Sequence, residues 1–295
     1  MKPPPFSYHD PATIADVLAL LGRLENAKLL AGGQSLMPML NMRYVQPDHV
    51  IDLNGVGGLS YVREAGNALE IGAMTRQREI ETSGLVRTRC PLMREAILQV
   101  GHRQTRNRGT LGGSLCHLDP AAELVAVAAA LDATVGITGP KGRRELPFAD
   151  FPAGYMTPAL APDELLTDVR FPLWAKGHGH AFVEFSRRHG DFAVVSAAAL
   201  LEAERSGRIT RATVTIGGAG PTPVRAREVE RALVGNHASD ELFREACECL
   251  RTIDAVGDVH APAAYRQQLA VVLARRALEK AHSRMSGSGH RLPPV

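Results

Sequence analysis

Two adjacent glycines that follow a short apolar run constrain this chain more than any other feature. Segment 28–44, KLLAGGQSLMPMLNMRY, reads as a strand end, a turn of small residues at Ala31–Gly33, the polar pair Gln34 and Ser35, and a helix-like stretch at 36–40. Glycine permits positive φ and lets a ligand approach the backbone closely. Unpaired N–H groups at a helix start suit a phosphate. The open alternative is a tight turn that binds nothing.

A second glycine motif shifts the balance toward a ligand. Gly109–Ser114 reads GTLGGS, and His117, Asp119 and Glu123 follow it. Two such motifs in one chain predict a long ligand anchored at two points, such as a dinucleotide. Glu123 has two open explanations: a first-turn carboxylate stabilised by the helix dipole, or an acceptor for sugar hydroxyls of the ligand.

A third, similar tetrapeptide lacks this context. Thr215–Gly218 (TIGG) resembles Thr110–Gly113 (TLGG), but it runs into Gly220-Pro221 and no acidic helix start follows. We therefore expect the third tetrapeptide to form a structural turn.

The remaining pattern predicts a mixed fold with a domain boundary at 172–179. Asp10-Pro11 is expected to open the first helix, and 103–109 (RQTRNRG) reads as a polar surface loop. Predicted strands are 27–30, 49–53, 61–63, 68–72, 134–138, 165–171, 182–187, 192–202 and 209–216. Predicted helices are 10–24, 76–86, 91–100, 121–131, 226–234, 240–253 and 263–280.

Composition excludes several classes of protein. The net charge is +3 with scattered Lys and Arg, and aromatic residues make up 5%, so we expect no nucleic-acid binding. The four cysteines lack the spacing of a zinc or iron–sulfur site, and we predict no bound metal. Without an apolar run of ~20 residues we expect no membrane span. Few cysteines and no N-terminal apolar segment favour a cytoplasmic location.

Standard catalytic motifs are also missing. The chain contains no G-x-G-x-x-G after its first strand, no G-x-x-x-x-G-K-[ST], no G-x-S-x-G and no H-E-x-x-H. No acid–base constellation stands out beside either glycine motif, so we assign no catalytic residue.

In order, the segments AGGQSLMPMLNMR, IDL, IGAMT, RNRGTLGGSLCHLDPAAEL, GDFA and PVRA resemble one family. The chain is similar to the FAD-binding medium subunit of molybdenum hydroxylases, such as aerobic carbon monoxide dehydrogenase. That resemblance implies an α+β fold: a two-part FAD-binding domain of the p-cresol methylhydroxylase type and a C-terminal α+β domain. We expect the FAD-binding domain at 1–175 (parts about 1–55 and 56–175), the C-terminal flavoprotein domain at 176–284 and a flexible tail at 285–295.

The resemblance also implies which residues bind FAD. Ala31–Ser35 would wrap the pyrophosphate, and Thr110–Ser114 would form a second cradle. The full set of expected cofactor-binding residues is Leu30, Ala31, Gly32, Gly33, Gln34, Ser35, Arg106, Asn107, Thr110, Leu111, Gly112, Gly113, Ser114, His117, Asp119, Glu123, Leu166 and Phe192.

Two residues depart from the family pattern. Gln34 replaces a common histidine but keeps a hydrogen-bond donor. Phe192 stands where the carbon monoxide enzymes place a tyrosine near the flavin ring, so one hydroxyl is lost.

By the same resemblance the chain is an FAD-carrying oxidoreductase subunit. It would pass electrons from a small iron–sulfur subunit to an external acceptor, and a large molybdenum-cofactor subunit would oxidise the substrate, in a dimer of heterotrimers. Arg103, Arg106 and Arg108 are the charges best placed to dock a partner or hold the flavin. The alternatives are a free-standing flavin oxidase or reductase with its own substrate site, and a non-catalytic nucleotide-binding or scaffold protein.

Overall fold

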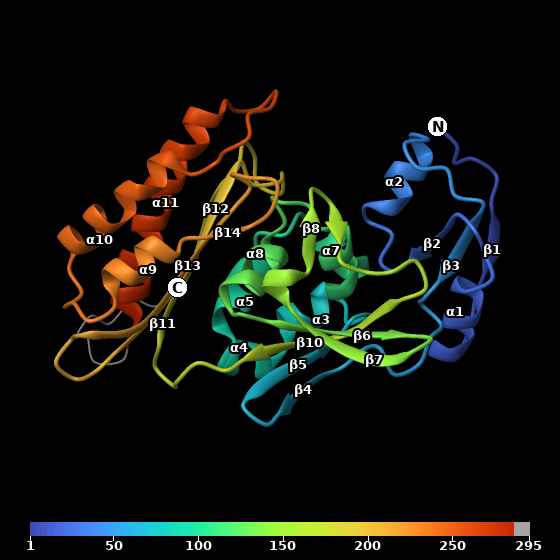
Figure 1. Ribbon diagram of the computed structural model, residues 1–295, viewed down its shortest axis with the longest axis horizontal. Helices are drawn as coiled ribbons and strands as arrows, with labels where there is room; N and C mark the ends of the chain where they lie inside the picture. Colours follow the sequence, from blue (N-terminus) through green and yellow to red (C-terminus); the bar gives the residue numbers. More distant parts are fainter. Residues whose placement is uncertain (286–295) are drawn as a thin grey trace.

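Three packed units form residues 1–285, the part of the chain that the computed structural model describes (Figure 1). The N-terminal unit contains β1 (Ser7–His9), α1 (Ile14–Leu21), β2 (Ala27–Leu30), α2 (Leu36–Asn41) and β3 (His49–Asp52). Its three strands are parallel, in the order β1-β3-β2. The parallel order places the carboxyl ends of β2 and β3, and the turns that follow them, at the same edge of the sheet.

The middle unit is an antiparallel sheet covered by short helices. Its strands, in sheet order, are β4 (Val62–Ala65), β5 (Ala68–Gly72), β10 (Leu165–Pro172), β6 (Thr134–Gly139) and β7 (Gly142–Pro147). Its helices are α3 (Gln77–Thr82), α4 (Gly84–Arg89), α5 (Pro91–Ile97), α6 (Arg103–Arg108), α7 (Leu111–His117) and α8 (Glu123–Ala130). The 3-10 turn η1 (Phe148–Asp150) and the hairpin of β8 (Pro152–Gly154) and β9 (Thr157–Pro158) connect β7 to β10.

The C-terminal unit is a second antiparallel sheet with its own helices. The strands β11 (Gly179–Phe185), β12 (Val195–Ala203), β13 (Ile209–Gly217) and β14 (Val224–Arg225) lie in chain order. The helices are α9 (Arg227–Leu233), α10 (Asp240–Cys247), η2 (Glu248–Thr252) and α11 (Ala263–Arg284). The predicted α+β class is therefore confirmed. The predicted tail lies, except for Met285, outside the described residues.

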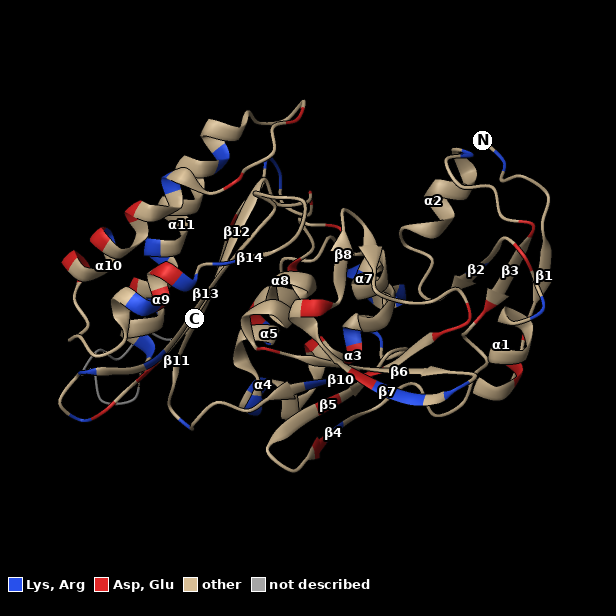
Figure 2. Ribbon diagram, viewed as in Figure 1, with Lys and Arg blue, Asp and Glu red and all other residues tan. Residues whose placement is uncertain are grey.

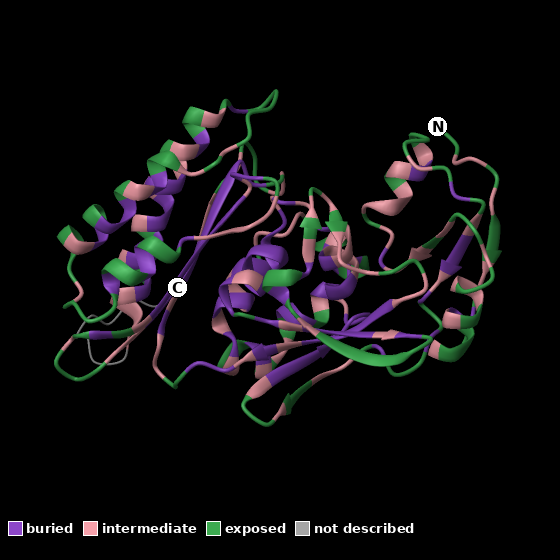
Figure 3. Ribbon diagram, viewed as in Figure 1, coloured by how far each residue is buried: buried purple, intermediate pink, exposed green. Residues whose placement is uncertain are grey.

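Buried residues, purple in Figure 3, lie along the sheets and on the helices that cover them. Their apolar side chains form three clusters, two of which include residues of more than one unit. The C-terminal sheet lies between its own helix α11 and helices α5 and α8 of the middle unit (Figure 1). Its strands face both ways: Phe182, Ala198 and Leu200 pack into the core of the middle unit, while Ala181 and Ala199 face α11. Leu165 of β10 packs into the core of the N-terminal unit. The C-terminal unit thus contributes side chains to the core of the middle unit, and the middle unit contributes one to the core of the N-terminal unit.

Several predicted elements differ in the structure. The predicted loop 103–109 is helix α6, because the buried Arg106 pairs with Glu81 and supplies the anchor that an apolar face would normally provide. The predicted helix 76–86 divides at Ser83, whose hydroxyl caps α4. The first helix is capped by Thr13 rather than Asp10, and the strand predicted at 192–202 begins at Val195, which leaves Phe192 in a loop.

Charges of both signs are interspersed over the visible ribbon (Figure 2). Strand β7 carries two consecutive arginines, and both pair with acids. Arg143 donates to Asp168 (2.9 Å), and Arg144 donates to Glu164 (2.7 Å). Among the described residues, no helix has the length and apolar character needed to cross a membrane.

Candidate functional site

A groove of about 770 Å³ lies where the three units meet. Its wall combines the turn after β2, the start of α7, the segment that leads into α8, and the loop between β11 and β12. The predicted site residues in that wall are Ala31, Gly32, Gly33, Gln34, Ser35, Thr110, Gly113, Ser114, His117, Asp119, Glu123 and Phe192. Residues that are far apart in the sequence are thus brought to one cavity.

The turn after β2 presents free backbone donors. Gly33 has φ +73°, which favours glycine, and its carbonyl accepts from the N–H of Met37 (3.0 Å). Within residues 1–285, the N–H groups of Gly32–Ser35 make no hydrogen bond, and the hydroxyl of Ser35 does not cap α2. Four unpaired N–H groups on a cavity wall form an anion-binding turn of the kind that phosphates occupy. The Gln34 amide bends back and donates to the Gly32 carbonyl (3.2 Å).

The second glycine motif uses most of its N–H groups within the fold. Leu111 donates to the Thr75 carbonyl, Gly112 to the Ala73 carbonyl, and Gly113 to the Thr110 hydroxyl, all within 3.1 Å. A Cβ on Gly112 would lie 2.7 Å from that of Ala73, so this glycine is required by packing. The second motif therefore offers fewer free N–H donors than the first.

Gly113 and Gly32 let the two motifs approach each other. A Cβ on Gly113 would lie 3.3 Å from the Ala31 Cβ, and one on Gly32 would lie 2.7 Å from the Cα of Gly109. The two motifs are therefore neighbouring walls of one groove. The first wall supplies N–H donors, and the second supplies a close surface and the Ser114 hydroxyl, which has no hydrogen-bond partner among the described residues.

Glu123 is the most unusual acid in the groove. Its side chain begins α8, is 3% exposed and has no basic partner within hydrogen-bonding distance in the described chain. Burial, followed by the nearby carboxyl groups of Glu184 and Asp119, raises its pKa to about 8. A carboxylate held mainly by the helix dipole would show the opposite shift. Glu184 itself has a pKa raised to about 7 by burial and a buried, unpartnered Oε2.

The raised pKa of Glu123 predicts a pH dependence of stability. Between pH 4.5 and about 8, the folded chain keeps a proton on Glu123 that the unfolded chain has already released. The free energy of unfolding of the wild type should therefore fall, relative to Glu123→Gln, as pH rises through this interval. Urea unfolding of both proteins at several pH values measures the difference. Parallel pH profiles would contradict a buried, neutral Glu123.

Two loops close the ends of the groove. Asp119 accepts from the N–H of Ala121 (2.8 Å) and shapes the entry to α8. His117 lines the groove, and burial lowers its pKa. Phe192, 60% exposed, comes from the β11–β12 loop. The same loop packs closely against His102: a Cβ added to Gly190 would lie only 2.8 Å from the Nδ1 atom of His102. The C-terminal unit thus completes a site built mainly by the other two.

Some predicted site residues lie outside the groove wall. Arg106 is buried and donates to Glu81 (2.8 Å) and to the Val100 carbonyl (2.8 Å), so it holds the neighbouring loop 100–101 in place. Leu111 and Leu166 belong to the core. Asn107 is exposed, Gly112 is buried against Ala73, and Leu30 borders a separate cavity.

The structure also adds groove residues that the sequence did not single out. They come from β2, α2 and the segment after it, α3, the loop 100–101, α6 and its C-cap, α7, the N-cap of α8, the β8–β9 hairpin and the β11–β12 loop. None of them is among the expected cofactor-binding residues. They are Lys28, Leu36, Met39, Tyr44, Val45, Gln77, Val100, Gly101, Thr105, Gly109, Cys116, Ala122, Tyr155, Met156, Pro158, Gly190 and Asp191. Of these, Leu36, Met39, Gly109, Cys116, Ala122, Gly190 and Asp191 belong to segments that carried the resemblance.

These features fit an extended dinucleotide that carries a pyrophosphate. The free N–H groups match the anionic centre, and a neutral, buried Glu123 can exchange hydrogen bonds with sugar hydroxyls without repelling phosphate.

Comparison with known proteins agrees with this chemistry. Residues 4–174 match the family described as the FAD binding domain in molybdopterin dehydrogenase, and residues 180–281 match the CO dehydrogenase flavoprotein C-terminal domain. The 6-hydroxypseudooxynicotine dehydrogenase complex subunit alpha of Paenarthrobacter nicotinovorans is 38% identical, over 95% of this chain and 96% of that protein. The carbon monoxide dehydrogenase medium chain of Afipia carboxidovorans is 37% identical, over 96% and 99%.

Solved structures match over nearly the whole chain. Carbon monoxide dehydrogenase from Hydrogenophaga pseudoflava superimposes with a TM-score of 0.94 at 35% identity, covering 97% of this chain and all (100%) of that one. Quinoline 2-oxidoreductase from Pseudomonas putida 86 gives a TM-score of 0.93 at 33% identity, covering 98% and 100%. The chain belongs to the family of FAD-binding medium subunits of molybdenum hydroxylases, the flavoprotein subunits of these oxidoreductases.

Proposed function

We propose that FAD lies along the groove with its pyrophosphate on the N–H groups of Gly32–Ser35. The observation that carries this assignment is the set of four unpaired N–H groups on the groove wall. Gly113 and Ser114 would close on the same group from the facing motif. Bound FAD supplies the redox chemistry, while the chain binds it, orients it and limits its exposure to water.

We further propose that Glu123 binds a hydroxyl of the FAD sugar chain. Replacing Glu123 by alanine should weaken FAD binding by about 0.5–1.5 kcal/mol, the range for a hydrogen bond between neutral groups, or roughly 2- to 10-fold. Glu123→Gln keeps the shape and the capacity to donate and accept, so its affinity should stay near that of the wild type. Fluorescence titration of the flavin-free chain with FAD measures both.

The same titration can also contradict a role of Glu123 in FAD binding. An unchanged dissociation constant in Glu123→Ala, together with a small loss of stability of ~0.3–1 kcal/mol, would identify Glu123 as a partner of the helix dipole alone. If the wild-type chain itself binds no FAD, and its purified form lacks the absorbance of an oxidised flavin, the whole assignment is wrong and a non-catalytic nucleotide-binding or scaffold role becomes the better reading.

We propose that electrons reach this FAD from a separate small iron–sulfur subunit and leave to an external acceptor. The four thiols of the chain do not gather at one place: Cys90 is buried in the core of the middle unit, Cys116 lies in α7, and Cys247 and Cys249 belong to the C-terminal unit. The relatives carry the names of a complex subunit and of medium chains, which supports a heteromeric assembly. A large molybdenum-cofactor subunit would oxidise the substrate, in a dimer of heterotrimers located in the cytoplasm.

The runner-up is a free-standing flavin oxidase or reductase. Purification of the native protein separates the two proposals, because the heteromeric assembly predicts two further polypeptides together with iron and molybdenum.

We also propose domain limits at 1–175 and 176–284, with the first domain divided near residue 55. The three separate apolar clusters support this division.

A further inference from the structure

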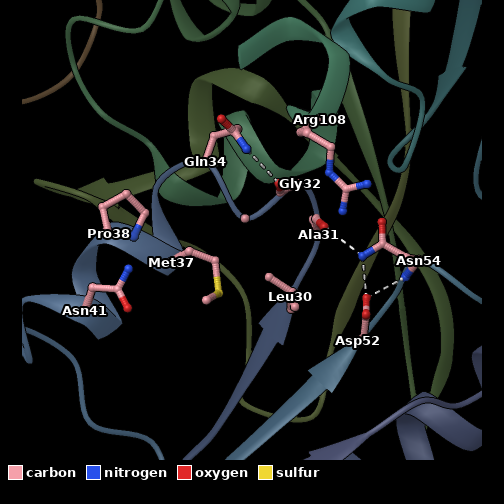
Figure 4. Close-up of a pocket in the computed structure, with 11 residues that line it drawn as sticks. Leu30, Ala31, Gly32, Gln34, Met37, Pro38, Asn41, Asp52, Asn54 and Arg108 are labelled. Atoms are coloured by element: carbon pink, nitrogen blue, oxygen red, sulfur yellow. Dashed lines mark hydrogen bonds between the residues drawn. The ribbon is translucent and has the colours of Figure 1, made fainter. Parts of the chain in front are cut away.

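A second cavity, of about 480 Å³, lies beside the groove (Figure 4). It shares the turn Ala31–Gln34 with the groove but uses a different face of α2, where Met37, Pro38 and Asn41 line it. The groove instead contacts Leu36 and Met39. The volume falls within the ~300–1,000 Å³ typical of small-molecule sites. The turn that we assign to the FAD pyrophosphate is thus a wall between two cavities.

The cavity contains an unpaired guanidinium group. Within residues 1–285, the side chain of Arg108, an exposed residue at the cavity wall, makes no hydrogen bond and no ion pair, and Figure 4 shows it directed toward Asn54. Arg76 lies next to it and donates to the Arg108 carbonyl and to the side chain of Asn54. The charge of Arg108 adds to burial in lowering the pKa of Arg76. An anion bound at Arg108 would reduce the repulsion between these two cations.

Polar groups near Arg108 can complete a ligand's hydrogen bonds. Asp52 accepts from the Tyr8 hydroxyl (2.6 Å) and the Asn54 N–H (2.8 Å), which holds its carboxylate at the cavity edge with lone pairs to spare. Asn41 has a side-chain amide that forms no hydrogen bond with the described residues. Arg108, Asn54 and Asp52 lie on one side of the cavity, and Met37, Pro38 and Asn41 lie on the other (Figure 4).

We propose that this cavity binds a phosphate ester of mononucleotide size, separately from FAD. The planar guanidinium of Arg108 suits a phosphate, which it can contact with two parallel N–H groups. The apolar side chains of Leu30, Met37 and Pro38 offer a surface for a flat ring. Asp52 can accept from a ribose hydroxyl or a ring amine. The site would add a second ligand to the chain, beyond the cofactor of the proposed function.

Calorimetric titration of the flavin-loaded protein with AMP tests the proposal. One AMP per chain should bind, and Arg108→Ala should weaken binding about 10- to 100-fold, the effect of losing a charge-assisted hydrogen bond. Arg108→Lys keeps the charge but not the planar fork, so it should fall between these values. Arg103→Ala is the matched control: Arg103 lies on the same helix, is exposed and does not line the cavity, and its loss should leave AMP binding unchanged.

Two further titrations separate the sources of affinity. Adenosine lacks the phosphate and inorganic phosphate lacks the ring, and both should bind more weakly than AMP. Flavin content and circular dichroism should be the same in all variants. The proposal is overturned if AMP binds only to flavin-free protein in competition with FAD, if Arg108→Ala binds AMP as tightly as the wild type, or if inorganic phosphate binds as well as AMP. If the chain proves unable to bind FAD, the AMP affinities of the wild type and of the Arg108 variants are compared on flavin-free protein, and the comparison still tests this cavity.

Discussion

Replacing Gly33 by valine is expected to give a folded chain that no longer retains FAD. Gly33 has φ +73°, a conformation that a β-branched residue resists, so the turn must move and its N–H groups must turn away from the groove. Losing two hydrogen bonds to the pyrophosphate, each about 1.5–3 kcal/mol, weakens FAD by roughly 10²- to 10⁴-fold. The flavin-to-protein ratio after gel filtration and a titration of the flavin-free protein measure the loss.

Gly58→Val is the matched control. Gly58 has φ +80°, and a Cβ there would meet no atom within 4 Å, so the substitution introduces similar backbone strain in open space. Gly58 does not line the groove. We expect Gly58→Val to keep its flavin and to lose a comparable amount of stability. Full flavin occupancy in Gly33→Val with normal circular dichroism would show that the turn after β2 does not hold the cofactor.

The glycine motifs could be predicted because their requirement is local. Gly33 must adopt positive φ, and Gly32 and Gly113 must let two backbones approach, and in each case no other residue type serves as well. Their neighbours Ser35 and Thr110 are helix starts with a recognisable sequence pattern. The third tetrapeptide, 215–218, does not line the groove: residues 215–217 end β13, and Gly218, directly after the strand, donates to the Pro120 carbonyl (2.8 Å).

Elements stabilised by charge were harder to predict. Helix α6 has no apolar face, because its buried residue is Arg106, whose ion pair with Glu81 joins positions that are far apart in the sequence. Strand β7 reads GRRELP and lies at a sheet edge with most side chains exposed, so it shows no alternation of apolar and polar residues. In both elements the stabilising partner lies in another segment, and no local pattern reveals it.

The outer walls of the groove depend on tertiary packing alone. Tyr155 and Met156 reach it from the short β8–β9 hairpin, and Lys28 reaches it from β2. The difference in free N–H donors between the two motifs was also not predictable. The N–H groups of Leu111 and Gly112 donate to the carbonyls of Thr75 and Ala73, which belong to an earlier segment of the chain. Sequence thus predicted the ligand class and groove residues from both glycine motifs, the entry to α8 and the β11–β12 loop, while the structure added the walls from α2, α3 and the β8–β9 hairpin.

Mixing the isolated, FAD-loaded chain with carbon monoxide or aromatic heterocycles is expected to leave the flavin oxidised. The groove that would admit a substrate is the one that we assign to FAD, so its titratable residues Glu123, His117 and Asp119 would face the cofactor rather than a substrate. Flavin reduction should therefore appear only after the iron–sulfur and molybdenum subunits are added. Electron transfer needs close approach, and we propose that the flavin ring is reached at the exposed Phe192, which lines the groove. Anaerobic absorbance spectra follow the reduction directly.

The Gly33→Val chain, mixed with the same two subunits, separates assembly from electron transfer. It should still join the complex, because Gly33 lies in the groove rather than on an outer surface, yet it should pass no electrons to an added acceptor. Restored transfer in that flavin-free complex would show that electrons leave by a route that avoids this chain. Reduction of FAD by substrate in the isolated wild-type chain, with cofactor analysis finding flavin alone, would show that the substrate is oxidised within this chain, as a free-standing flavin oxidase requires.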